Sequence, residues 1–271
     1  MKRVGILYHP KIAAARALAE ELVGFLPSLD ASVWICSVWE EEGARAQVDG
    51  TELILSVGGD GTILRAARAV VPFAIPIVGI NLGRLGFLTE LSAEQARKQL
   101  PAFLKGEGWI DERAMLQAEL ANRGPIHALN DILLGRGAIP RVIYVETTID
   151  GTHLTTYKAD GVIIATATGS TGYSLADGGP ILYPQAREII VNPISAHPTF
   201  ANALVLPPTA IVELRVRTDH QAMLSIDGQL NLALESGDTI RVSISPHTAR
   251  FLRAQPPTFF YSTLMERLVP K

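Results

Sequence analysis

The sequence predicts an α/β protein with an N-terminal open, mostly parallel α/β domain followed by an all-β, sandwich-like domain. Over roughly the first third of the 271 residues, strand-like and helix-like segments alternate, which is typical of a parallel sheet. Short β-rich runs then follow one another between turn signals such as Asp150-Gly151. The expected segments are residues 1–111, residues 112–250 and residues 251–271. We expect the last segment to pack back on the first domain.

The elements of the first domain follow from the spacing of apolar residues. These recur at helical spacing over Ala13–Leu26, which predicts a helix. Ser92, followed by Glu94 and Gln95, resembles a capping box and predicts a helix that ends at Leu104. The other expected elements are strands at Lys2–Tyr8, Ala31–Val38, Glu52–Val57 and Ile75–Ile80 and a helix at Ile63–Val71.

In the second domain, turn signals separate the predicted strands. Val142–Ile149 and Thr152–Lys158 flank an Asp-Gly pair and predict a hairpin. Further strands are expected at Leu204–Val216, Met223–Ile226 and Thr239–Ser245. We expect no helix in this domain, and a final strand or helix at Thr258–Glu266.

The composition excludes several classes of protein. A hydrophobic fraction of 48% with 19% charged residues excludes intrinsic disorder. A net charge of -3 provides no field to hold nucleic acid or an anionic bilayer, so we expect neither partner. The single cysteine, Cys36, excludes an internal disulfide, and it is expected to be a buried thiol. Prolines interrupt the longest uncharged stretch, Ile189–Val212, and no signal peptide is recognisable, so a cytoplasmic location is expected.

The first segment that indicates chemistry is Gly58-Gly-Asp-Gly-Thr62, at the end of a predicted strand. Its glycines allow close approach of a phosphate, and the helix that follows offers unpaired N–H groups. The absence of a lysine excludes a P-loop. A carboxylate among these glycines could bind a metal or accept the proton of a substrate hydroxyl, so Asp60 is the candidate base. The alternative is a tight turn in which Asp60 is the N-cap of the following helix. Arg65 and Arg68 follow the turn, and one of them is expected to reach a bound phosphate; for Arg68 a surface position fits at least as well.

The second segment is dense in hydroxyls and glycines between Thr166 and Ser174. Backbone amides and hydroxyls that face a sugar or phosphate would account for this composition. The alternative is a β-arch in which the hydroxyls satisfy the backbone of the turn.

Together these segments resemble the NAD kinase family, in order and spacing over nearly the whole chain. The Gly-Gly-Asp-Gly-Thr element alone is shared with diacylglycerol, sphingosine and 6-phosphofructo kinases, so the other motifs make the resemblance specific. The matching motifs are Gly58–Thr62, Asn81-x-Gly-x-Leu-Gly-Phe-Leu-Thr89, Asn130-Asp131, Asp160-Gly161, Thr168-Gly-Ser-Thr-Gly-Tyr173 and Gly178-Gly-Pro180.

The resemblance implies phosphorylation of the 2′-hydroxyl of the adenosine ribose of NAD by ATP or polyphosphate, which produces NADP. It further implies a divalent metal, with Mg²⁺ expected, and a homodimer or homotetramer. Asp60 is then the general base or the group that orients the hydroxyl. The remaining NAD-binding positions implied are Gly61, Phe87, Asn130, Asp131, Arg141, Lys158, Asp160, Thr171, Gly172, Tyr173, Ser174, Leu175, Ala176 and Gln229. Donor phosphates are expected at Gly58, Gly59, Gly61, Thr62 and Arg65.

The chain departs from the family pattern at a few positions. Ala176 and Asp177 replace a Ser-Ala pair, and Asn202, near His197, stands where an arginine is common. Two alternatives remain open: another kinase of the superfamily that acts on a lipid or sugar, and a non-catalytic nucleotide sensor. The composition shows no membrane-facing stretch, and the intact Asp60 argues against a sensor. The phosphate donor, the preference for NAD or NADH, the oligomer and the regulation are not determined by the sequence.

Overall fold

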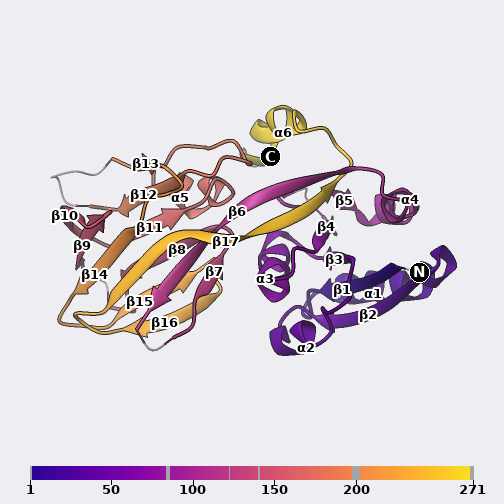
Figure 1. Ribbon diagram of the computed structural model, residues 1–271, viewed down its shortest axis with the longest axis horizontal. Coiled ribbons are helices and arrows are strands. Elements are labelled where there is room, and N and C mark those ends of the chain that lie inside the picture. Colours follow the sequence, from indigo (N-terminus) through magenta and orange to yellow (C-terminus); the bar gives the residue numbers. More distant parts are fainter. Residues whose placement is uncertain (1, 84–85, 122, 140, 197–201, 269–271) are drawn as a thin grey trace. The chain divides into compact units, whose positions relative to one another are not determined.

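The computed structural model describes residues 2–83, 86–121, 123–139, 141–196 and 202–268. The chain divides into two compact units (Figure 1). Unit 1 comprises Met1–Glu112 and Ala249–Lys271, and unit 2 comprises Arg113–Thr248. The chain passes from one unit to the other inside two long strands, β6 (Trp109–Leu120) and β17 (Thr239–Arg253).

Unit 1 is built on a parallel sheet in the order β4-β3-β1-β2. The last residues of β17 also pair with β4 in parallel. Its strands are β1 (Lys2–Tyr8), β2 (Ala31–Ser37), β3 (Leu53–Val57), β4 (Pro76–Asn81) and β5 (Leu91–Ser92). Its helices are α1 (Ala13–Phe25), the 3₁₀ helix η1 (Leu26–Leu29), α2 (Glu41–Arg45), α3 (Asp60–Val70), α4 (Ala93–Leu104) and α6 (Phe259–Leu268).

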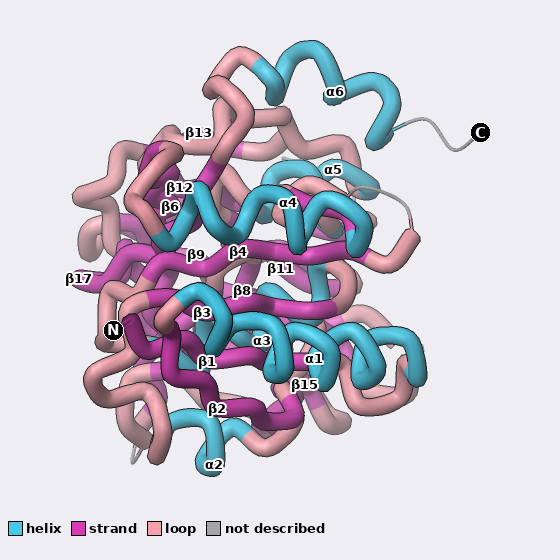
Figure 2. Tube along the Cα trace, turned by 90° about the vertical axis from the view of Figure 1, so that its right-hand side faces the viewer, coloured by secondary structure: helices cyan, strands magenta, loops and turns pink. Residues whose placement is uncertain are grey.

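Helices cover both faces of this sheet. Leu22 of α1 and Leu100 of α4 pack on the same face as Ile6 and Ile80. Helix α3 lies on the opposite face, because a Cβ on Gly79 would collide with Ile63 and successive strand residues point to opposite faces. Figure 2 shows α1, α3 and α4 alongside the strands. In such a sheet, ligands bind beyond the carboxyl ends of the strands, which is where the Gly58–Thr62 turn lies after β3.

Unit 2 is a sandwich of two antiparallel sheets. One contains β10-β9-β14-β17 with β6 and β7, and the other is β13-β12-β11-β8-β15-β16. The strands not yet defined are β7 (Ile126–Ala128), β8 (Asp131–Arg136), β9 (Ile143–Ile149), β10 (Thr152–Ala159), β11 (Gly161–Ala165), β12 (Ile189–Ile194), β13 (Leu204–Leu206), β14 (Val212–Arg217), β15 (Ala222–Ile226) and β16 (Leu230–Leu234).

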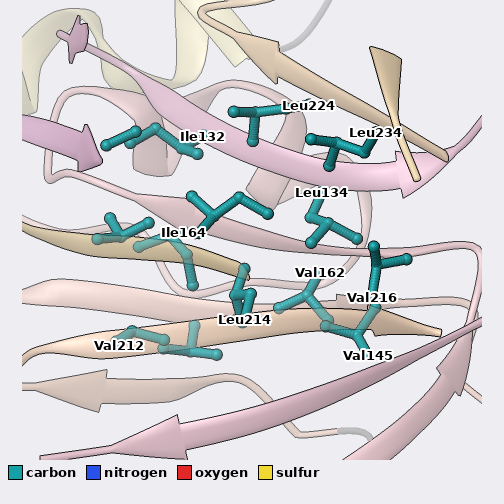
Figure 3. Close-up of a cluster of buried hydrophobic side chains, with 14 of the residues drawn as sticks. Ile132, Leu134, Val145, Val162, Ile164, Val212, Leu214, Val216, Leu224 and Leu234 are labelled. Carbon is teal, nitrogen blue, oxygen red and sulfur yellow. The ribbon is translucent and has the colours of Figure 1, made fainter. Parts of the chain in front are cut away.

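The core of unit 2 lies between these sheets. Val145 and Val216 from one sheet meet Leu134 and Val162 from the other, all fully buried (Figure 3). Alternate residues of each strand point inward, as the packing of two sheets requires. The predicted fold class, a parallel α/β part followed by a β-sandwich, is therefore confirmed.

Most predicted elements of the first domain are present within a few residues. The capping box is formed: Ser92 Oγ accepts from the Gln95 N–H, and Gln95 accepts from the Ser92 N–H. Cys36 is 7% exposed, as expected, and burial raises the pKa of its thiol. Helix α3 begins at Asp60 rather than at Ile63, because the glycine turn leads directly into the helix.

Several expectations for the second domain were wrong. Two short helices, η2 (Gly169–Thr171) and α5 (Tyr173–Ala176), occupy the segment that we expected to be free of helix. The run Leu204–Val216 is two strands rather than one, because Pro207 and Pro208 cannot donate to a sheet. Strands β6, β7, β8, β12 and β16 were not predicted.

Candidate functional site

The glycine turn joins β3 to α3 in unit 1. Gly58 has φ +154°, its N–H donates to the Ile80 carbonyl over 2.9 Å, and a Cβ there would collide with the Thr62 hydroxyl. A side chain at this position is therefore excluded both by conformation and by space. Gly59 is the N-cap residue of α3, with no side-chain cap, so the alternative that Asp60 caps the helix was wrong.

The Asp60 carboxylate instead reaches another loop of unit 1. Its Oδ2 accepts from the Phe87 N–H over 2.8 Å and its Oδ1 from the Leu88 N–H over 3.1 Å. A Cβ on Gly86 would collide with Oδ1, so the loop can approach this closely only with glycine there. Each carboxylate oxygen keeps one lone pair for a further donor. The two amides thus fix the orientation of a carboxylate that can still accept a proton.

The remaining residues of the turn differ in exposure. Gly59 and Gly61 are exposed, whereas Thr62 is buried. The Thr62 hydroxyl has no hydrogen-bond partner in the described part of the chain, and neither has the buried Ser56 hydroxyl on β3. The first turn of a helix leaves backbone N–H groups for an anion, so the exposed glycines form the accessible side of the turn.

Arg65 lies one turn into α3 and is half-buried. Burial and the neighbouring Arg68 charge lower the pKa of Arg65. Its guanidinium lies 5.8 Å from the ring of the exposed Trp39. Arg68, in contrast, is 7% exposed and pairs with Glu41 over 3.0 Å, so the surface interpretation of Arg68 was wrong.

In unit 2, the hydroxyl-rich segment bonds largely to protein backbone. The Thr166 hydroxyl donates to the Leu129 carbonyl over 2.6 Å and the Ser170 hydroxyl to the Ala167 carbonyl over 2.6 Å. The Thr171 hydroxyl donates to the Thr168 carbonyl over 3.3 Å. These hydroxyls therefore satisfy backbone groups of the segment, as the second interpretation of its composition predicts. The segment forms two short helical turns, however, and not a β-arch.

This segment lies against Asn130 and Asp131. A Cβ on Gly169 would collide with the Asn130 backbone, and one on Gly172 would lie 3.8 Å from Asn130 Nδ2 and 3.9 Å from Asp131 Oδ2. Asn130 Oδ1 is buried and has no hydrogen-bond partner among the described residues. A buried acceptor without a partner is costly, so it is a natural place for a donor group of a ligand.

Asp131 lies next to a second carboxylate, Asp227, which the sequence marks only as part of a turn. Asp227 accepts from the backbone N–H groups of Leu129 (3.1 Å), Asn130 (2.7 Å) and Asp131 (3.2 Å). Burial, with the Asp227 charge as the second cause, raises the pKa of Asp131 to about 7. At neutral pH, Asp131 is therefore divided between its two protonation states.

The other predicted NAD-binding residues of unit 2 are more scattered. Asp160 forms an ion pair with Arg136 over 2.9 Å, a partner that the sequence did not reveal. Burial raises the pKa of Asp177; a hydrogen bond from the Ser195 backbone opposes this rise and the Asp160 charge adds to it. Four of these residues are exposed: Arg141, Lys158, Tyr173 and Ala176. Four are half-buried, namely Thr171, Gly172, Leu175 and Gln229, and Ser174 is fully buried.

The structure thus gathers the predicted residues into two sets, one in each unit. Gly58–Thr62 and Phe87 lie together in unit 1, while Asn130, Asp131 and Gly172 lie together in unit 2. The Arg267 guanidinium lies 5.5 Å from the Phe87 ring, a contact with no signal in the sequence. His197 lies outside the described residues.

Two further features bear on metals and membranes. The described residues contain no group of His, Cys, Asp and Glu side chains that would hold a metal ion by itself. Among the same residues, no helix is both long enough and apolar enough to cross a membrane.

Comparison with known proteins connects both units to one family. The model of the ATP-NAD kinase N-terminal domain matches residues 13–108 and that of the ATP-NAD kinase C-terminal domain matches residues 129–254. An NAD kinase from Dehalococcoides mccartyi is 46% identical over 98% of this chain and 96% of its own length. An NAD kinase from Chloroflexus aggregans is 39% identical over 99% of each chain.

Solved structures agree with this assignment. Yeast NADH kinase complexed with NADH superposes with a TM-score of 0.88 and 26% identity, over 99% of this chain and 87% of that one. An NAD kinase from Archaeoglobus fulgidus in complex with ATP has a TM-score of 0.80 and 25% identity, over 98% of each chain. The glycine turn with its fixed carboxylate and the Asn130-Asp131 pair lie in the two matched regions, and this chain belongs to the NAD kinase family.

Proposed function

We propose that this chain transfers the γ-phosphoryl group of ATP to the 2′-hydroxyl of the adenosine ribose of NAD, producing NADP and ADP. The observation that carries the proposal is the Asp60 carboxylate, held by two backbone amides at the start of α3 within a glycine turn. Family membership supports the pair of substrates, since the solved relatives were complexed with NADH or with ATP.

In the proposed step, the ribose hydroxyl oxygen forms a bond to the γ-phosphorus. The bond from that phosphorus to the bridging oxygen of ADP breaks, and ADP leaves with the electron pair. The hydroxyl proton passes to Asp60. A ribose hydroxyl is a weak nucleophile, and a general base contributes about 10² to 10⁴-fold to such a step. Because the Phe87 and Leu88 amides hold the carboxylate, little reorganisation is needed when the proton moves.

The donor phosphates would lie on the exposed side of the turn. Gly59 and Gly61 give the backbone access, the N-terminus of α3 is electropositive, and Arg65 follows one turn later. Gly58 and Thr62 then serve by shaping the turn, since both are buried.

A divalent ion fits this arrangement as part of the substrate complex. Mg²⁺ is usually held by phosphates with one or two carboxylates, and Asp60 is a single carboxylate without two further acidic or histidine neighbours in the described chain. When bound, Mg²⁺ neutralises the charge that develops on the donor phosphates.

NAD would be recognised largely by unit 2. Asn130 Oδ1 has no donor among the residues that the structure describes, and Asp131 lies beside it, so the two suit the hydroxyls and the carboxamide of NAD. The exposed Tyr173 offers a flat apolar face to a base. Similar contacts are proposed for Phe87, Arg141, Lys158, Asp160, Thr171, Gly172, Ser174, Leu175, Ala176 and Gln229.

The test is a coupled assay specific for NADP, with NAD or NADH as acceptor and ATP or polyphosphate as donor. Formation of NADP with equimolar ADP supports the proposal, and the comparison of donors and acceptors defines the preference. Nucleotide binding without product would favour a sensor instead. Phosphorylation of a lipid or sugar with no NADP would favour another kinase of the superfamily.

A further inference from the structure

The Asp227 carboxylate bonds to the backbone of the pair proposed to bind NAD. It lies in the turn between β15 and β16, is 7% exposed, and accepts from three consecutive N–H groups, those of residues 129–131. The Asp227 N–H donates in return to the Asp131 carbonyl over 2.9 Å. The peptide bonds on both sides of Asn130 are thereby fixed to the β15–β16 turn.

We propose that Asp227 is a positioning residue for NAD, which holds the Leu129–Asp131 backbone so that the side chains of Asn130 and Asp131 are presented to the dinucleotide. This inference rests on the proposed function of Asn130 and Asp131. Asp227 itself is not expected to touch the substrate, because all three of these hydrogen bonds go to backbone of the same unit.

A comparison within unit 2 shows that the turn alone does not require a buried carboxylate. Asp150-Gly151 has nearly the same backbone as Asp227-Gly228: φ is 50° and 77° in the first pair and 51° and 64° in the second. Asparagine serves such a turn as well as aspartate. Asp150 is nevertheless exposed, and its Oδ1 accepts one hydrogen bond, from the Ile211 N–H over 2.8 Å, where Asp227 accepts three.

Placing Asp227 here also has an electrostatic cost. Two buried carboxylates that lie close together repel each other when both are ionised. Strands β11 and β15, which pair with β8, carry no charged residue. In the Thr166–Ser174 segment that lies against Asp131, the exposed Tyr173 is the titratable residue, and Arg113 donates to Thr168 Oγ1 of that segment. Arg136, at the far end of β8, is paired with Asp160. The three hydrogen bonds to Asp227 offset this repulsion, which points to a function in holding the backbone.

The experiment compares Asp227→Asn and Asp227→Ala with the matched control Asp150→Asn, each in the full chain. NAD affinity is measured by calorimetry without donor, and kcat and KM by the NADP assay. We expect both Asp227 variants to weaken NAD binding about ten-fold or more with kcat within about two-fold, since hydrogen bonds to a charged group are lost. Asp150→Asn should change neither quantity. If Asp227→Ala does not fold, as judged by circular dichroism, the Asn variant decides.

The pH dependence of NAD affinity is a second measurement, which distinguishes a positioning role of Asp227 from a role in stability alone. Removing the Asp227 charge takes away the second cause of the raised pKa of Asp131, so the pH midpoint of NAD affinity should move to lower pH in Asp227→Asn. Unchanged NAD affinity in the folded variants, or an unchanged midpoint, would overturn the inference. If the wild-type chain bound NAD but formed no NADP, the proposed function would fail, and the calorimetric comparison would still decide the role of Asp227.

Discussion

Arg253 Nη1 donates to the carbonyl oxygen of Leu88 over 2.9 Å. The N–H of the same Leu88 donates to Asp60, so the loop that orients the carboxylate is itself held from its other side. Arg253 is 6% exposed and also pairs with Asp111 and Glu90, over 3.2 Å in each case. A planar guanidinium with several fixed donors is suited to this arrangement.

Replacement of Arg253 by lysine should therefore lower turnover. Lysine keeps the charge that Glu90 and Asp111 require but not the geometry that holds Leu88. We expect kcat to fall about ten-fold, with KM for NAD within about two-fold, because Asp60 loses its fixed orientation. Arg217→Lys, at an exposed ion pair with Glu146, is the control. An unchanged kcat in a folded Arg253→Lys variant would contradict this argument.

Gly86→Ala tests the close approach of the loop to Asp60. A Cβ there would collide with the carboxylate, so either the loop or the Asp60 side chain must move. We expect a loss of at least about ten-fold in kcat, since a small displacement of the proposed base would be costly. Gly24→Ala, on the exposed side of α1 with no atom within 4 Å of the added Cβ, should leave activity unchanged. Equal activities of the two variants would show that the contact is dispensable.

Asp60→Asn tests the proposed base directly. The amide cannot take the hydroxyl proton, so turnover should fall by about 10² to 10⁴-fold. Calorimetry should show NAD affinity close to that of the wild type. Retention of full turnover would remove Asp60 from the role of base.

Asp131 should make the stability of the chain depend on pH. Its pKa in the folded chain is about 7 against an ordinary value of 3.8, so between these values the folded state keeps a proton that the unfolded state releases. The free energy of unfolding therefore falls as pH rises through this window, by about 1.4 kcal/mol per unit of pKa difference.

Asp131→Asn removes this contribution. Urea unfolding of both proteins at about pH 5 and about pH 8 should show a smaller loss of stability in the variant. Identical pH dependence in the two proteins would show that Asp131 is not the group responsible.

The sequence predicted best where the local signal was strong. The apolar runs that became β1, β2, β3 and β4 and the capping box at Ser92 are short-range patterns, and the structure has them nearly in place. The glycine turn was found for the same reason, because a cluster of glycines directly after an apolar strand is itself a local signal for a tight turn.

What the sequence did not reveal depends on contacts between distant residues. Asp227 resembles an ordinary turn residue until its hydrogen bonds to Asn130 and Asp131, 97 and 96 positions away, are known. The contact of Arg253 with Leu88 spans 165 positions. The two helical turns of the hydroxyl-rich segment were not predicted, because the segment packs against a distant residue, Asn130, through Gly169.

The two crossings of the chain inside β6 and β17 have a consequence for biosynthesis. Unit 1 is discontinuous, so its sheet lacks the pairing of Arg250 and Phe251 with β4 until the ribosome has translated residue 251. Until then, Glu90 and Asp111 also lack the Arg253 guanidinium. Unit 2 is continuous and its residues are all translated earlier. The nascent polypeptide can therefore fold unit 2 before unit 1 is complete.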